Sequence, residues 1–173
     1  AKPKRVMAIG QKTFLENLGF EIHDSIQCII EWETTSNNTF SQTLLVNWID
    51  PENTSSMSDQ NIKFVGTNGR YEGDQKDRGL ITVSDKKQFE HINPDFCKSF
   101  QNEQEQQVWE GYGINSIKTF IYDVYEIINQ RKKPVDFENI RPTFSEALYA
   151  TSVLDSALKS LEKNAKWIDV KTI

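Results

Sequence analysis

The chain has 173 residues, 37% of them hydrophobic and 26% charged, a make-up typical of a single globular domain with a sizeable core. The formal net charge of -5 provides no positive field for a phosphate backbone, so a nucleic-acid partner is not expected. No apolar run approaches the roughly 20 residues that span a bilayer, and the N-terminus lacks the apolar core of a signal peptide. We therefore expect a cytoplasmic protein without a membrane partner.

The cysteines and histidines give no sign of a metal site or a disulfide framework. Cys28 and Cys97 are far apart and have no second cysteine nearby, which predicts two free thiols. His23 and His91 also lack neighbouring ligand residues, so no bound metal is expected.

The first 19 residues predict one strand followed by a short irregular segment. Residues 4–9 form a brief apolar run that ends at Gly10, as a strand leading into a turn would. Residues 11–19 have apolar side chains at helical spacing, but the segment is short and ends at a glycine. It is therefore predicted to be a loop or a single helical turn.

The stretch from Asp24 to Asp50 predicts a β-hairpin of two long strands, around which the rest of the chain is organised. Residues 35–38, Thr-Ser-Asn-Asn, tolerate turn geometry. Apolar side chains alternate with polar ones at the two-residue period of a strand. The alternating apolar residues are Ile26, Cys28, Ile30 and Trp32 in the first arm, and Phe40, Leu44, Val46 and Trp48 in the second.

Three apolar residues, Ile29, Leu45 and Ile49, interrupt this alternation and fall on the face that should contact water. One interpretation is that the open face of the sheet contacts a partner, which would make the protein a homo-oligomer. The alternative is a monomer whose sheet is buried on both faces.

Further strands are predicted between residues 51 and 110. Residues 51–60 should form an exposed loop, and Asn68-Gly69 predicts a tight hairpin between the runs 62–67 and 70–72. Residues 80–83 and 89–92 suggest two more short strands, after a charged turn at residues 74–79. The glutamine-rich residues 93–110 lack a period and predict a solvated connector.

A helix is predicted from about residue 117, with Asn115 or Ser116 as its N-cap. It should end at the cations that precede Pro134, because they suit the negative end of the helix dipole and proline stops a helix. Its apolar positions recur every three or four residues. They are Ile117, Phe120, Ile121, Val124, Ile127 and Ile128.

The capping-box pattern from Thr143 to Glu146 predicts the start of a second helix. The small residues Ala150 and Ala157 would allow close approach to a neighbour, and residues 166–170 alternate as a closing strand. The order of elements predicts an α+β fold, an open and mainly antiparallel sheet with helices packed on one face. The expected apolar stripe of the second helix is Phe144, Ala147, Leu148, Leu154, Leu158 and Leu161.

Motifs for nucleotide binding and hydrolysis are missing from the sequence: GxGxxG after a strand, the P-loop, GxSxG and HExxH. Two polar sets remain as candidates for binding a ligand. Tyr112, Asn115 and Ser116 lie near a helix start, where hydroxyls and backbone amides can receive an acidic or hydroxylated ligand. Lys76 and Arg78 lie in the charged turn. Helix capping for the first set and simple solvation for the second are the alternatives.

Four further residues on the first predicted helix are interpreted as its outer face. They are Tyr122 and Tyr125 together with the carboxylates Asp123 and Glu126. A stand-alone enzyme using Asp123 or Glu126 would need a second convergent group, and the sequence does not identify one.

Four segments, taken in order, resemble the C-terminal part of the glucose-fructose oxidoreductase and inositol dehydrogenase (Gfo/Idh/MocA) family. They are residues 3–8, the strand from Asp24, the run 62–69 (IKFVGTNG), and the ending from Pro142 through Ser160 to Val170. The resemblance spans nearly the whole chain. A full-length member has an N-terminal Rossmann domain for NAD(P) and a C-terminal domain whose open sheet shapes a sugar site and often mediates oligomers.

The family's catalytic residues lie upstream, in a Glu-Lys-Pro triplet and an Asp-x-x-x-His motif. Here Lys2-Pro3 lacks the glutamate, and no aspartate stands four residues before His23. The resemblance therefore implies that residues 1–173 are a single C-terminal substrate-binding and oligomerisation domain without the Rossmann domain. Such a domain has no catalytic residue and no cofactor of its own, while the parent enzyme uses NAD or NADP.

Two functions from different classes follow. In the first, the chain is part of an NAD(P)-dependent oxidoreductase that acts on a sugar or cyclitol alcohol, and it is inactive alone. In the second, it is a freestanding binding or assembly module with no redox partner. A GxGxxG-bearing stretch encoded upstream of Ala1 would favour the first, and a natural start codon there the second.

Overall fold

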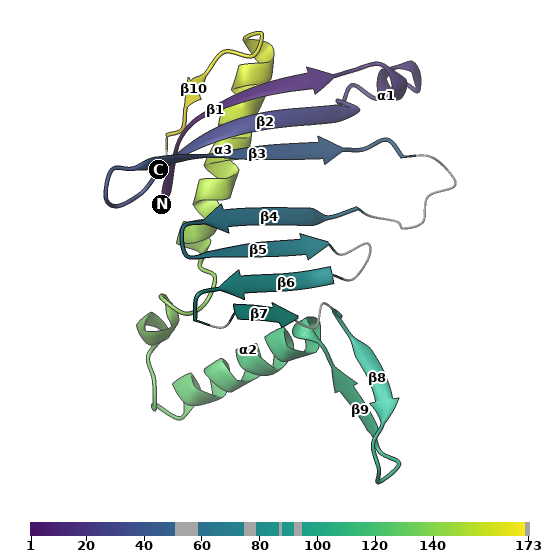
Figure 1. Ribbon diagram of the computed structural model, residues 1–173, viewed down its shortest axis with the longest axis vertical. Coiled ribbons are helices and arrows are strands. Elements are labelled where there is room, and N and C mark those ends of the chain that lie inside the picture. The colour runs from purple at the N-terminus through teal and green to yellow at the C-terminus, as the bar shows by residue number, and fades with distance from the viewer. Residues whose placement is uncertain (51–58, 75–78, 87, 92–94, 172–173) are drawn as a thin grey trace. The chain divides into compact units, whose positions relative to one another are not determined.

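The computed structural model describes residues 1–50, 59–74, 79–86, 88–91 and 95–171 (Figure 1). The chain divides into two compact units, one formed by residues 1–53 with 138–173 and the other by residues 54–137. The strands that pair do so in antiparallel fashion, and a long helix packs on the sheet of the first unit. This architecture confirms the predicted α+β class.

The first unit contains a four-stranded sheet in the order β10-β1-β2-β3. Its central hairpin is the one predicted from the sequence, and its register places Ile26 opposite Val46 and Trp32 opposite Phe40. Asn37 adopts a φ of 60° in the turn, a conformation that asparagine tolerates better than most residues. The strands are β1 (Lys2–Gln11), β2 (Ser25–Glu33), β3 (Thr39–Asn47) and β10 (Ile168–Asp169).

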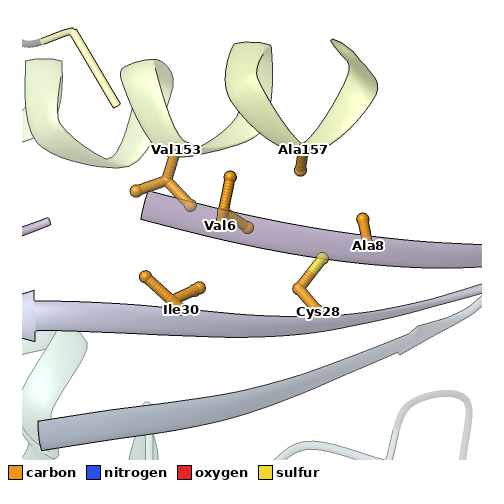
Figure 2. Packing of buried hydrophobic residues seen from close by; sticks show 6 residues of the cluster. All are labelled: Val6, Ala8, Cys28, Ile30, Val153 and Ala157. Carbon is orange, nitrogen blue, oxygen red and sulfur yellow. The ribbon is translucent and has the colours of Figure 1, made fainter. Parts of the chain in front are cut away.

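Helix α3 (Phe144–Glu162) covers one face of this sheet and encloses the core of the unit. Figure 2 shows side chains of α3 directed at β1 and β2. Because alternate strand residues point to one face, β1 and β2 contribute every second residue to this cluster. The buried residues are Val6, Ala8, Cys28, Ile30, Val153 and Ala157.

The face of α3 that contacts the sheet differs from the predicted leucine stripe. Phe144 is 95% exposed, and Leu148, Leu154 and Leu158 are also exposed, so these four assignments were wrong. The buried face is made of small or short side chains, which let the helix backbone approach β1 closely. Its members are Val153, Ser156, Ala157 and Ser160. Leu161 is partly buried against the core as predicted, whereas Ala150 is exposed.

Ser160 joins α3, β1 and the C-terminal segment through one buried hydroxyl. Its Oγ accepts a hydrogen bond from the Ala8 backbone N–H at 3.0 Å and donates one to the Lys166 carbonyl at 2.6 Å. Ser160 is fully buried and Ala8 is 1% exposed, so the Ala8 N–H depends on this hydroxyl for a partner.

Replacing Ser160 with alanine should lower the free energy of unfolding by about 1–3 kcal/mol, because the buried Ala8 N–H loses its partner and the bond to the Lys166 carbonyl is also lost. Urea unfolding followed by circular dichroism measures the change. Ser145→Ala is the matched control, since Ser145 is exposed on the same helix, and a change below about 0.5 kcal/mol is expected. Equal losses in the two variants would contradict this role of Ser160.

The predicted capping box at the start of α3 is confirmed. Thr143 Oγ accepts from the Glu146 backbone N–H at 3.2 Å, and Glu146 Oε2 accepts from the Thr143 backbone N–H at 3.1 Å. Two backbone N–H groups at the helix start are thereby satisfied without solvent.

The second unit contains a four-stranded antiparallel meander in the order β4-β5-β6-β7. Gly66 pairs with Gly69, so the turn residues are Thr67 and Asn68, one position earlier than the predicted Asn68-Gly69 turn. Most of the predicted loop 51–60 and of the charged turn 74–79 lies outside the described residues, as does Ile92. The strands are β4 (Asn61–Gly66), β5 (Gly69–Asp74), β6 (Gly79–Ser84) and β7 (Gln88–His91).

The predicted solvated connector at residues 93–110 instead contains a hairpin of β8 (Lys98–Gln101) and β9 (Gln107–Glu110). Its tight turn is held by the side-chain carbonyl of Asn102, which accepts from the Gln104 and Gln106 backbone N–H groups at 3.0 Å and 2.9 Å. The glutamines obscured the strand alternation in the sequence, because they have little preference of their own for a strand face.

Helix α2 (Tyr112–Ile128) begins earlier than predicted, and Gly111 is its N-cap. Asn115 and Ser116 are therefore inside the helix, and their predicted capping role was wrong. The helix ends before the cations at 131–133, and a short 3-10 helix, η1 (Pro134–Phe137), follows. Among the described residues, no helix has the length and apolar character needed to cross a bilayer.

The faces of α2 agree with the prediction only in part, since Tyr122 and Tyr125 are exposed as predicted. Asp123 and Glu126, expected on the outer face, are buried. Glu126 pairs with Arg131 at 3.2 Å, which offsets part of the cost of burying its charge. Val124 and Ile127 are half-buried. The other predicted apolar residues, Ile117, Phe120, Ile121 and Ile128, are exposed.

Candidate functional site

Tyr112, Asn115 and Ser116 all lie in the first turns of α2. Residues three and four apart in a helix share a face, so the structure brings the three side chains together on one side of the helix start. All three are exposed and could contact a ligand. Lys76 and Arg78, the other predicted ligand residues, lie outside the described part of the chain.

The backbone at the start of α2 is partly occupied by the preceding segment. The Tyr112 N–H donates to the Asp95 carbonyl, and the Gly113 N–H donates to the Phe96 carbonyl, each at 3.0 Å. The Phe96 and Tyr112 rings meet edge to face at 5.2 Å between centroids. Two amides expected to face a ligand are thus already bonded, and recognition at this site would depend on side-chain hydroxyl and amide groups.

An open pocket of about 420 Å³ lies over strands β4, β5 and β6 of the second unit. It is a shallow depression on an exposed sheet, more open than the concave sites that bury most of a small ligand. The sequence did not identify the pocket, although Asp74 and Gly79 border the predicted charged turn. The lining residues are Asn61, Ile62, Lys63, Glu72, Gly73, Asp74, Gly79 and Ile81. Tyr112, Asn115 and Ser116 are not among them.

The pocket presents both donors and acceptors of hydrogen bonds. Lys63 Nζ lies 2.8 Å from Glu72 Oε1, and Arg70 Nε lies 3.4 Å from the same oxygen. The hydrogen bond from Lys63, aided by the charges of Lys63 and Arg70, holds the pKa of Glu72 below its usual value. An ionised carboxylate next to an ammonium group suits hydroxyl groups of a ligand, which donate to the first and accept from the second.

Asp24 is a buried carboxylate that the sequence analysis did not single out. It is fully buried in the first unit and accepts three backbone N–H bonds, from Thr13, Phe14 and Leu15, each at 2.8 Å. These donors begin α1 (Phe14–Asn17), the single helical turn predicted at residues 11–19. Their hydrogen bonds, that from Leu15 foremost, hold the pKa of Asp24 below its ordinary value of 3.8.

This pKa shift predicts a stability loss in acid. Because the folded-state pKa is lowered, the stabilisation is fully present above the unfolded value of 3.8 and disappears as the pH falls through that value towards the folded one. Urea unfolding at about pH 7, 5 and 3.5 should show a steeper acid loss for the unchanged chain than for Asp24→Asn, whose amide cannot ionise. Equal pH profiles would contradict a role for the Asp24 charge.

Neither the described side chains nor the sequence motifs identify a cofactor or metal site. No group of three or more His, Cys, Asp or Glu within the described residues is placed to hold a metal ion. The chain also lacks the glycine-rich turn that brings backbone amides close to a dinucleotide pyrophosphate.

Comparison with solved structures finds the same fold within two larger proteins. An oxidoreductase from Sinorhizobium meliloti matches 96% of this chain over 47% of its own length, with a TM-score of 0.65 and 13% sequence identity. A protein from Thermotoga maritima, also assigned to the oxidoreductases, matches 98% of this chain over 41% of its own length, with a TM-score of 0.58 and 16% identity.

The similarity is one of fold, and it covers only part of each matched protein. The chain spans less than half the length of either oxidoreductase. No protein-family model and no curated protein matches the sequence. At this low identity the shared feature is the α+β fold, and activity does not follow from fold alone.

Proposed function

We propose that residues 1–173 form the substrate-binding and oligomerisation part of a longer NAD(P)-dependent oxidoreductase that acts on a sugar or cyclitol alcohol. The observation that carries this proposal is the fold match, which covers nearly all of this chain but less than half of each oxidoreductase. The order of sequence segments that resembles the Gfo/Idh/MocA family supports the same assignment.

In this proposal the chain contributes no redox chemistry by itself. Hydride transfer needs a nicotinamide held by a dinucleotide-binding fold, and this chain has no glycine-rich fingerprint for one. The cofactor, NAD or NADP, would be bound by another part of the longer protein. What this chain supplies is contacts that position the alcohol, with the polar start of α2 and the charged pocket over β4–β6 as the two candidate surfaces.

The direct test uses the longer protein, with the sequence encoded upstream of Ala1 included. NAD(P)-dependent oxidation of a panel of sugars and cyclitols is expected. The chain of residues 1–173 alone should show no saturable binding of NAD(H) or NADP(H) tighter than about millimolar, or about 4 kcal/mol, in calorimetric titration. Tight binding to the isolated chain, or a longer protein without any such activity, would overturn the proposal.

Tyr112→Phe in the longer protein should raise the KM for the sugar by the equivalent of about 0.5–1.5 kcal/mol, the net value of one hydrogen bond. The KM for the nicotinamide cofactor should stay unchanged, because the residue would contact substrate only. Asn115→Ala and Ser116→Ala test the rest of the set. An unchanged sugar KM in all three variants would leave these residues without a substrate role.

The open face of the first sheet is proposed as the oligomer interface. Leu45 is 62% exposed and Ile29 39%, and both lie on the face opposite α3, together with the exposed Ile9. Ile49, the third residue predicted for this surface, lies beyond the end of β3 and is half-buried. Arg5 and Glu31 pair at 2.6 Å on the same face, so a polar ion pair adjoins the apolar group.

The second function, a freestanding binding or assembly module, shares this interface but has no redox partner. The charged pocket over β4–β6 is compatible with it, because a binding site needs no cofactor. It would be favoured if the natural gene begins at this chain and no dinucleotide-binding sequence precedes it.

A further inference from the structure

The β8–β9 hairpin, hereafter the arm (residues 98–110), is a two-stranded sheet that pairs with no other described strand. A two-stranded hairpin alone is marginally stable in water and usually packs against another element. The arm has apolar side chains for such packing. Phe100 pairs with the half-buried Val108 on one face, and Trp109 projects from the other. Phe100 is 43% and Trp109 53% exposed.

The joint between the arm and α2 is tightly built. Gly111 has a φ of +128°, and a Cβ there would lie 2.5 Å from the Phe96 carbonyl oxygen. The Phe96 ring also packs on Gly113, where a Cβ would meet its carbon atoms at 2.5 to 2.8 Å. With the backbone bonds from Tyr112 and Gly113 to residues 95 and 96, these contacts fix the direction in which the arm leaves the helix.

The charges of the arm and of α2 are complementary. The arm carries Glu103, Glu105 and Glu110 against one lysine, and all four side chains are exposed. Along α2 and the loop to residue 133, both acids, Asp123 and Glu126, are buried. The exposed charged residues there are all cations: Lys118, Arg131, Lys132 and Lys133.

We propose that the arm of one copy of this chain docks on the exposed face of α2 of a second copy, and that the second arm returns the contact. Each copy carries both surfaces, so a two-fold axis would satisfy both at once. Apolar side chains from one face of the arm would cover the helix stripe, while arm glutamates meet Lys118 and the cations that follow the helix. The helix stripe consists of Ile117, Phe120, Ile121 and Ile128.

Photo-crosslinking identifies the partner surface without requiring a known register. Benzoylphenylalanine replaces Phe100, and this variant is mixed with an equal amount of nitrogen-15-labelled unchanged chain. Mass spectrometry of the digested product is expected to show links from position 100 to residues 117–128 of the labelled copy. Links only within one chain, or only to other segments, would overturn the proposal.

Sedimentation supplies an independent readout. Phe120→Glu should raise the dissociation constant of the arm-mediated dimer at least about tenfold, because a charge would face an apolar arm. Phe144→Glu is the matched control, since Phe144 is an exposed helical phenylalanine outside this surface, and no change is expected. Circular dichroism verifies that both variants are folded. Equal effects of the two substitutions would contradict docking at α2.

The salt dependence of association and a substitution on the open sheet face distinguish the arm contact from the sheet-face interface. The arm contact should weaken when sodium chloride is raised from about 50 to 500 mM, because its charges are exposed and screened by salt. Leu45→Glu should leave the crosslink from position 100 to α2 intact. A crosslink that disappears in Leu45→Glu would assign all association to the sheet face and overturn the arm proposal.

Discussion

Ile30→Ala is expected to lower the free energy of unfolding by about 2–4 kcal/mol. Ile30 is 2% exposed and lies in the cluster that α3 encloses against β1 and β2. Removing three carbons there loses apolar burial and leaves a cavity that the sheet cannot close, because β2 is paired on both sides. Urea unfolding of the full chain measures the change.

The adjacent residue provides the control for this prediction. Ile29 has the same side chain and the same strand, but it points to the opposite face and is 39% exposed. Ile29→Ala should cost clearly less than Ile30→Ala, because part of the Ile29 side chain stays in water and its removal leaves no enclosed cavity. The comparison should be made at a protein concentration low enough to prevent association. Similar losses at both positions would mean that the sheet is buried on both faces.

The strand faces of the central hairpin could be predicted because a period of two is unambiguous where one face is buried. Alternation from Ile26 to Trp32 placed each of these side chains on the α3 side, as the structure shows. The same alternation identified Ile29 and Leu45 as the residues left on the other face.

The helix faces could not be predicted in the same way, because a helix with apolar residues on several sides has more than one possible buried stripe. In α3 the sequence suggested the large leucines, yet the contact with β1 uses Val153, Ala157 and Ser160. The close approach of α3 to β1 selects short side chains. The distance between the two elements is a property of the tertiary structure, and the sequence of the helix alone does not give it. In α2 the pairing of the buried Glu126 with the exposed Arg131 depends likewise on the chain beyond the helix end.

The candidate site was predicted only in part. Tyr112, Asn115 and Ser116 are together because they share a helix, and sequence spacing alone implies that. The pocket over β4–β6 depends instead on cross-strand neighbours such as Lys63 and Glu72, which are nine residues apart in the sequence and paired in the sheet. The hydrogen bonds from the backbone of residues 13–15 to the Asp24 carboxylate likewise join residues that are apart in the sequence.

Leu45→Glu is expected to weaken association through the open sheet face by about 100-fold or more, since a carboxylate at the centre of an apolar interface would be desolvated without a partner. Leu45 is 62% exposed, and Ile9 shares its register across Gln27, so the substituted charge would stand beside the remaining apolar group. Within one chain the glutamate would be solvated, so folding should be little affected.

Sedimentation velocity of the full chain distinguishes the outcomes of this substitution. The unchanged chain should be larger than the 20.0 kDa monomer, and Leu45→Glu should be smaller than the unchanged chain. If the arm also mediates association, Leu45→Glu combined with Phe120→Glu should give only the 20.0 kDa species. Leu154→Glu, on the exposed side of α3, is the control and should change nothing. An assembly that survives Leu45→Glu at unchanged size would exclude the open face as its interface, and Ile9, Ile29 and Leu45 would then be isolated surface residues of one chain.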